Sequence, residues 1–269
     1  MYSKIDMLKS ISFHPKLAAV IDVLVNVAML FVFGKLSSWW MVWVWLGIRV
    51  AIWALLLWSV YYAKEMSRVK HLISLSAMLA GITLFLLFIE WRFAWYASAA
   101  LFSFFSFFSF WLLPASDLGL SVFVKPHLRW RFVMSIIGLA GIFQGIQAII
   151  LLQILPNIHQ LVWLSVSSLC AALFAGWWWW EYNPMVGKKI WLSVALWFVL
   201  ISELVWVINL LPLGYLTGSL ALVWVWYVLW LLFRFNLTPE GVHWRKQIVF
   251  LSSNAFLFIL FLFFISLWK

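Results

Sequence analysis

Nine long apolar runs, separated by short polar segments, divide the chain from one end to the other. A helix needs about 20 apolar residues to cross the roughly 30 Å hydrocarbon layer of a bilayer, and each run is close to that length. The runs are continuous rather than alternating, which excludes a membrane β-barrel. We therefore expect an all-α, polytopic integral membrane protein with nine transmembrane helices. The predicted spans lie near 17–34, 39–60, 72–90, 93–113, 132–155, 160–180, 190–212, 215–233 and 247–268.

The composition supports this class and excludes others. Hydrophobic residues make up 67% of the chain and charged residues 10%, whereas soluble domains have about half and about a quarter. A soluble enzyme and a disordered chain are therefore both excluded. The net charge of +10 does not indicate a nucleic-acid partner, because no polar stretch is long enough to carry a basic domain. A single cysteine, Cys170, rules out an internal disulfide and a multi-cysteine metal site.

The distribution of basic residues predicts the orientation. With the N-terminus inside, 14 of the 18 lysines and arginines fall in inner segments and three in outer ones. Inner loops of membrane proteins carry this excess. We expect an N-in, C-out protein of a bacterial-type cytoplasmic membrane. Residues 1–16 are expected to be a cytoplasmic or interfacial segment and not a signal peptide, because no apolar core follows their charges before Pro15.

An internal repeat is suggested by two features. Residues 58–113 and 177–232 share eleven identical positions at an offset of 119, and a histidine precedes the first, fifth and ninth spans. Both features predict a 4+4+1 parallel repeat, whose symmetry axis runs along the membrane normal. The predicted divisions are 1–16, 17–119, 120–238 and 239–269.

Three ionisable residues lie inside predicted spans: Asp22, Arg49 and Glu203. Charges are costly in hydrocarbon, so such residues face the protein interior or a cavity and mark functional or packing sites. Arg49 is expected to pair with Asp22, its neighbour in the first hairpin, or with Glu203, which lies at the best matching depth. Such a cluster either holds helices together or coordinates a substrate or ion, and the sequence leaves both interpretations open.

Several neighbours are expected to extend this cluster. Asn26 lies one turn after Asp22 on the same helix face. The aromatic rings of Trp45 and Trp53, four residues before and after Arg49, are placed for cation–π contact. Gln144 and Gln147 in the fifth span are candidates to join the same polar network.

Small residues predict close helix contacts. Gly141 and Gly145 form a GxxxG step in the fifth span, with Gly138 one turn earlier. Ser103, Ser106 and Ser109 recur at every third position of the fourth span. Both patterns let helix backbones approach each other in a membrane.

Three His-x-Lys/Arg segments precede spans and form weak candidates for binding a lipid phosphate. They are also explained as ordinary basic flanks whose side chains reach the interface. The residues are His14 and Lys16, His127 and Arg129, and His243 and Arg245.

No catalytic, metal-binding or cofactor-binding motif is present, neither a GxSxG elbow, nor HExxH, nor a P-loop. The 23 tryptophans are explained as interfacial belts and packing residues. Two functions therefore stay open. One is a small carrier or permease that uses Asp22, Arg49 and Glu203. The other is a non-catalytic membrane subunit or scaffold that binds partner proteins or anionic lipid.

Overall fold

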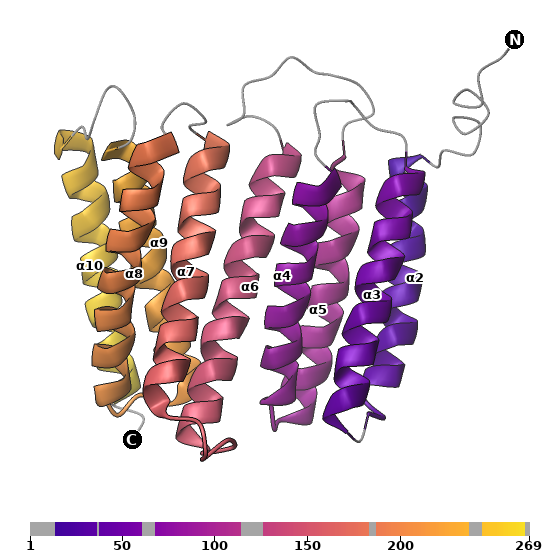
Figure 1. Ribbon diagram of the computed structural model, residues 1–269, viewed down its shortest axis with the longest axis horizontal. Helices are drawn as coiled ribbons and strands as arrows, with labels where there is room; N and C mark the ends of the chain where they lie inside the picture. Colours follow the sequence, from indigo (N-terminus) through magenta and orange to yellow (C-terminus); the bar gives the residue numbers. More distant parts are fainter. Residues whose placement is uncertain are drawn as a thin grey trace, which may run out of the picture. The chain divides into compact units, whose positions relative to one another are not determined.

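The computed structural model describes residues 14–36, 38–60, 68–113, 126–182, 187–236 and 244–266. These residues form nine helices and no strand (Figure 1). In chain order the helices are α2 (Pro15–Phe33), α3 (Trp39–Ser59), α4 (Arg68–Leu87), α5 (Arg92–Trp111), α6 (Pro126–Leu151), α7 (Gln160–Tyr182), α8 (Gly187–Leu210), α9 (Tyr215–Asn236) and α10 (Trp244–Ser266).

Each of the nine described helices contains a stretch long and apolar enough to cross a membrane. This agrees with the nine spans predicted from the apolar runs. The largest difference at a helix start is in α6, which begins at Pro126, whereas the predicted span begins at residue 132. Proline is favoured in the first turn of a helix, so the basic segment 126–131 is helical instead of a flanking loop.

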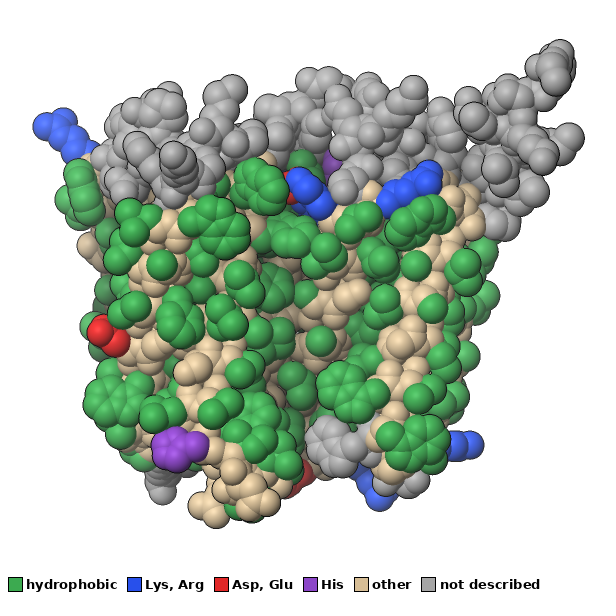
Figure 2. All heavy atoms as spheres, in the orientation of Figure 1, with side chains coloured by type: hydrophobic (Ala, Val, Ile, Leu, Met, Phe, Trp, Pro, Cys, Tyr) green, Lys and Arg blue, Asp and Glu red, His purple; other side chains and the backbone are tan. Residues whose placement is uncertain are grey.

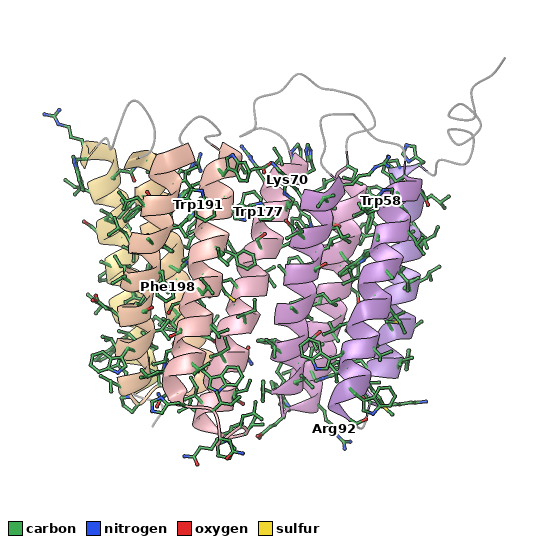
Figure 3. The ribbon with its side chains drawn as sticks, viewed as in Figure 1. Trp58, Lys70, Arg92, Trp177, Trp191 and Phe198 are labelled. Carbon is green, nitrogen blue, oxygen red and sulfur yellow. The ribbon has the colours of Figure 1, made fainter. Side chains whose placement is uncertain are left out.

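The contacts divide the chain into two compact units, residues 1–142 and 143–269, and the boundary falls inside α6. The predicted repeat boundary at 119/120 rests on sequence similarity instead of contacts, and it stays a prediction. In unit 1 successive helices alternate in direction, so that α2, α4 and α6 all begin at one end (Figure 1). We call this the basic end of unit 1. Figure 3 shows Lys70 at this end and Arg92 at the opposite one.

Unit 1 is held together by α2 and α4, each of which packs against both α3 and α5. Ala18 and Ala19 of α2 are fully buried, and their small side chains permit a close approach of neighbouring helices. Larger core side chains include Leu57, Leu75 and Phe110, all with 0% exposure.

Glycines bring α4 and α6 into backbone contact within unit 1. A Cβ on Gly81 would lie 2.1 Å from the Gly138 carbonyl oxygen, and one on Gly141 would lie 2.0 Å from the Gly81 carbonyl oxygen. The predicted small-residue face of the fifth span therefore makes a helix contact. It uses Gly138 and Gly141, and its counterpart is Gly81, which the sequence did not single out.

Unit 2 is built on the α7–α8 pair, with α9 against both helices and α10 against α9. The Val194 side chain of α8 packs directly on the backbone of α7 at Gly176, where a Cβ would lie 2.3 Å from Val194 Cγ2. Trp179, Trp197 and Phe233 form an aromatic cluster with ring centroids 4.9–5.6 Å apart. The α10 helix is joined to α9 by a hydrogen bond from Trp224 Nε1 to Asn254 Oδ1, 3.1 Å long.

The outer surface of the described helices is strongly apolar. Bulky side chains such as Leu24, Phe31 and Trp43 are about 70% exposed (67%, 73% and 70%). Figure 2 shows hydrophobic side chains covering the visible face between the two ends, where most of the lysines and arginines lie. Patches of this extent mark membrane or protein contact surfaces.

Candidate functional site

Asp22 of α2 is the centre of a buried polar cluster in unit 1. Its side chain is 0% exposed and accepts hydrogen bonds from three residues on two helices. Arg49 Nη2 and Trp53 Nε1 of α3 both donate to Oδ1, the latter over 2.7 Å. Asn26 Nδ2 donates to Oδ2 over 3.3 Å. A carboxylate offers about four acceptor positions, so most of those on Asp22 are occupied.

Arg49 is the cation of this cluster. It is 0% exposed and forms an ion pair with Asp22, the partner predicted from the first hairpin. Its guanidinium carbon lies 4.4 Å from the centroid of the Trp53 ring, the cation–π geometry expected for a shielded arginine. The indole nitrogen of Trp45, the other predicted ring, donates to the Met29 carbonyl over 2.8 Å. Arg49 Nε and Nη1 have no hydrogen-bond partner among the described residues.

Asn26 extends the cluster from α2 to α5. Its Nδ2 donates to Ser106 Oγ as well as to Asp22. The Ser106 hydroxyl in turn donates to the Ser103 carbonyl over 3.2 Å. The serine stripe of α5, predicted only as a packing face, therefore also supplies an acceptor to the polar cluster. We call Asp22, Asn26, Arg49, Trp53 and Ser106 the Asp22–Arg49 cluster.

The cavity next to this cluster is small. It is lined by polar atoms of Asn26 and Ser106 and by apolar side chains including Trp45 and Met78, and its volume is about 30 Å³. This is room for about one water molecule. In this conformation the cavity has room for a water molecule beside the cluster but not for an organic substrate.

Glu203 is the third ionisable residue predicted within a span, and the structure places it on α8. It belongs to unit 2, and its side chain is exposed. The side chains that follow and precede it on the same helix face are also exposed: Leu196, Val199, Trp206, Val207 and Leu210. Asp22 and Glu203 were the two predicted partners of Arg49, and the structure shows the ion pair with Asp22. Glu203 instead lies exposed among the apolar side chains of α8.

Gln144 and Gln147 of α6 also belong to unit 2. Both are buried, with exposures of 1% and 4%, and the Nε2 of each has no partner among the described residues. Gln147 Oε1 lies 2.7 Å from the position that a Cβ on Gly218 would take, so the amide packs directly on the α9 backbone. Their participation in a network with Arg49 stays a prediction.

The predicted headgroup residues have different surroundings. His14 is exposed and caps α2, its Nδ1 accepting from the Lys16 backbone N–H over 3.2 Å. The Lys16 amine lies 5.0 Å from the ring centroid of Trp111. His127 is 9% exposed, whereas Arg129 and Arg245 are exposed. His243 and most of the predicted segment 1–16 lie outside the described residues.

The structure also reveals buried polar residues that the sequence did not single out. His71 and Arg131 are 0% and 1% exposed at the basic end of unit 1. In the sequence each directly precedes a predicted span, at residues 72 and 132, which is a normal position for a basic flank at the membrane interface. Within the described parts of the chain, no three His, Cys, Asp or Glu residues gather as a metal site.

Comparisons with known proteins do not assign the chain. No protein family model matches the sequence, and no curated protein or solved structure does either.

Proposed function

We propose that this chain is a polytopic integral membrane protein that acts as a non-catalytic subunit and docks a partner membrane protein on α8. The observation that carries this proposal is a carboxylate on an otherwise apolar, outward-facing helix surface. We call this surface the Glu203 face. It consists of Leu196, Val199, Glu203, Trp206, Val207 and Leu210.

Depth makes the exposed carboxylate costly in lipid. In the apolar stretch Ile190–Leu210, Glu203 lies roughly 20 Å from the start and roughly 10 Å from the end at about 1.5 Å per residue. An ionised acid in the hydrocarbon core costs at least about 2.5–3.5 kcal/mol. A partner helix with a lysine, arginine or histidine at the same depth would pair with the carboxylate and remove this cost. Binding of such a helix would therefore be favoured at this position.

The partner is a different protein and not a second copy of this chain. Dimers with twofold symmetry place the same patch of both copies in contact, which brings two carboxylates together near the axis. Like charges at close range in a medium of low dielectric repel strongly. Charge complementarity therefore favours a transmembrane helix with a basic residue.

The carrier hypothesis has less support in unit 1. The Asp22 carboxylate already accepts from Arg49, Trp53 and Asn26, and the adjacent cavity holds about 30 Å³. A carrier built on this cluster would have to break these bonds in every cycle to admit its substrate. In a structural role, the same hydrogen bonds hold α2, α3 and α5 in one arrangement.

The apolar surface and the helix lengths support membrane insertion, and the charge distribution supports an orientation. In the described part of unit 1, Lys16, Arg68, Lys70, Arg129 and Arg131 lie toward the basic end, whereas Lys35 and Arg92 lie toward the other. By the positive-inside rule the basic end faces the cytoplasm. We propose the inner membrane of a bacterium-like cell, with the N-terminus inside and the C-terminus outside.

Copurification with charge-altered variants tests the docking proposal. The tagged chain is purified from native membranes in mild detergent, as wild type, Glu203→Gln, Glu203→Lys and the control Glu90→Lys, which alters an exposed turn residue. A membrane protein should copurify in constant ratio with wild type and with the control. We expect about tenfold less of it with Glu203→Gln and none with Glu203→Lys.

A charge swap between the two proteins then tests whether Glu203 contacts the partner's basic residue. Replacing the partner's basic residue by glutamate should restore copurification with Glu203→Lys. Unchanged copurification with Glu203→Lys would overturn the proposal. It would also be overturned if no membrane protein accompanies the wild-type chain in constant ratio.

A further inference from the structure

A groove with a volume of about 480 Å³ follows α2 and α5, which pack against each other in unit 1. Among its lining residues Ala99 and Ser103 of α5 are buried, whereas Phe31 of α2 and Phe104 of α5 are 73% and 57% exposed. The small side chains therefore form the floor, and the aromatic rings form the rim. We call this feature the α2–α5 groove.

The polar groups of the groove lie mainly at one end. Lys35 follows the last residue of α2 and Tyr96 lies in the second turn of α5, so both belong to the end of unit 1 opposite the basic end. Ser103 lies deeper, but its hydroxyl donates to the Ala99 carbonyl of its own helix over 3.0 Å. The groove therefore has a polar mouth, and the rest of it is apolar.

The length of the groove matches one leaflet of a bilayer. Its lining on α2 extends from Val23 to Gly34, roughly 16 Å at about 1.5 Å per residue, and half of the hydrocarbon layer is about 15 Å. Trp95 and Tyr96 lie at the mouth, and these residue types are enriched at the headgroup level of membrane proteins. With the membrane insertion proposed above, the groove runs from the interface to the bilayer midplane.

The groove is too narrow to be filled by a helix. A volume of 480 Å³ spread over roughly 16 Å corresponds to a channel about 6 Å wide, whereas a helix with its side chains is about 10–12 Å across. A single unbranched hydrocarbon chain is thinner than a helix. The dimensions therefore favour an acyl chain as the occupant.

The charge at the mouth is positive. Lys35 is exposed, and so is Arg92, which lies one turn before Tyr96 on the same side of α5 (Figure 3). Glu90 is the described acid at this end, so the net charge of these three residues is positive. The positive-inside rule explains why this end has few basic residues. It does not explain why the two that are present lie at the ends of two helices that pack against each other.

We propose that the α2–α5 groove binds one acyl chain of an anionic phospholipid, whose phosphate lies at Lys35 and Arg92. Ligand sites are mostly apolar, and a few polar groups fix the orientation of the ligand. Here the chain passes Ala100 toward Val23, and the two cations attract the phosphate. The site rests on the proposed membrane insertion. It is separate from the Glu203 face and needs no partner protein.

Native mass spectrometry of the purified protein tests the site. The delipidated chain in neutral detergent is titrated with dioleoyl phosphatidylglycerol or with dioleoyl phosphatidylcholine, which have the same acyl chains and differ in net charge. We expect one lipid to bind more tightly than the rest. Its apparent dissociation constant should be at least about fivefold lower for phosphatidylglycerol, the effect of one basic residue near an anionic headgroup.

A pair of matched variants tests the position of the chain. Ala100→Trp places a large side chain in the groove at an exposed position, and it should weaken the binding of both lipids at least about tenfold. Ala51→Trp is the control, since it makes the same change at an exposed position of α3 outside the groove. It should change binding less than about twofold. If Ala100→Trp does not fold, Ala100→Leu fills less of the groove and should still weaken binding.

A second pair tests the position of the headgroup. Lys35→Gln should weaken phosphatidylglycerol binding about fivefold and leave phosphatidylcholine binding within about twofold. Lys16→Gln removes the same charge from an exposed position at the other end of α2, and it should leave both lipids within about twofold.

Three results would overturn the proposal. The first is equal weakening by Ala100→Trp and Ala51→Trp, which would indicate lipid spread over the whole apolar surface. The second is equal weakening by Lys35→Gln and Lys16→Gln, which would indicate diffuse charge. The third is a wild-type mass that includes a second copy or another protein released by Ala100→Trp, because a protein would then cover the groove. Loss of the partner at the Glu203 face would leave all of these lipid measurements unchanged.

Discussion

Removing one charge of the Asp22–Arg49 pair should destabilise unit 1 strongly, and removing both should not. Arg49→Met keeps a long flexible side chain in the core but leaves the Asp22 carboxylate without a counter-charge. Asp22→Asn keeps the shape of the side chain but leaves the guanidinium uncompensated. Breaking a buried pair in this way costs about 3–5 kcal/mol, whereas replacing both partners is often close to neutral.

The hydrogen bonds of the cluster predict which single variant is worse. In Arg49→Met the carboxylate still accepts from Trp53 and Asn26, so the cost should lie near the lower limit, about 3 kcal/mol. In Asp22→Asn the cation keeps the Trp53 ring at 4.4 Å, and its Nε and Nη1 have no partner among the described residues. That cost should reach the upper limit, about 5 kcal/mol.

Denaturant unfolding in detergent micelles, followed by tryptophan fluorescence, measures these differences. The double variant Arg49→Met/Asp22→Asn should lie within about 2 kcal/mol of wild type, a large coupling for residues in contact. Arg49→Met/Glu203→Gln is the matched control and should show no rescue, because Glu203 is exposed on unit 2. Additive costs for Arg49 and Asp22 would refute the reasoning. A fully stable Arg49→Met protein would do so too, and it would favour a substrate-binding role for the cluster.

Three further predictions concern the packing of unit 1 and the topology of the chain. Gly81→Ala should prevent the α4–α6 contact, because the new Cβ would lie 2.1 Å from the Gly138 carbonyl oxygen. We expect the free energy of unfolding to fall by at least about 3 kcal/mol. Gly47→Ala, with nothing within 4 Å, is the control and should stabilise α3 by about 0.5–1 kcal/mol in the same unfolding assay. Trp53→Phe keeps a ring beside Arg49 but removes the 2.7 Å bond to Asp22, and should cost about 1.5–3 kcal/mol. An alkaline phosphatase reporter fused to the C-terminus should be active, and an inactive reporter there would contradict the nine-span, N-in topology.

The helices could be predicted from the sequence because one physical quantity, the length of an apolar run, determines whether a segment can span a bilayer. The start of α6 was missed because hydropathy does not detect a polar helical turn. The exact bounds of such a turn depend on backbone preferences, such as that of Pro126 for a first turn, which a hydropathy average does not include.

The site was predictable where neighbours are fixed by connectivity. Asp22 and Arg49 lie on consecutive helices joined by a short turn, so their pairing follows from the hairpin. Glu203 shows the limit of the same approach, since depth along a helix gives no information on the direction in which a side chain points. The burial of His71 and the hydrogen bond of Ser106 to Asn26 could not be predicted, because both depend on residues from other helices that the sequence alone does not bring together.

The repeat can be tested through the burial of equivalent positions. At the predicted offset of 119, four of the five α3 residues described as buried correspond to buried residues of α7: Trp45 to Leu164, Arg49 to Ser168, Trp53 to Ala172 and Leu57 to Gly176. The fifth, Val42, corresponds to Leu161, which is 59% exposed. The repeat predicts that the buried faces of the two helices have the same phase, although the charged pair of the first copy, Asp22 and Arg49, corresponds to the small residues Gly141 and Ser168 in the second. A face shifted by one residue would be rotated by about 100°. Cysteine scanning of both helices, in a Cys170→Ala background, should thus give protection from a thiol reagent that coincides at this offset. A protection pattern on α7 displaced by one or two residues would contradict the repeat, because each copy would then bury a different face of the same helix.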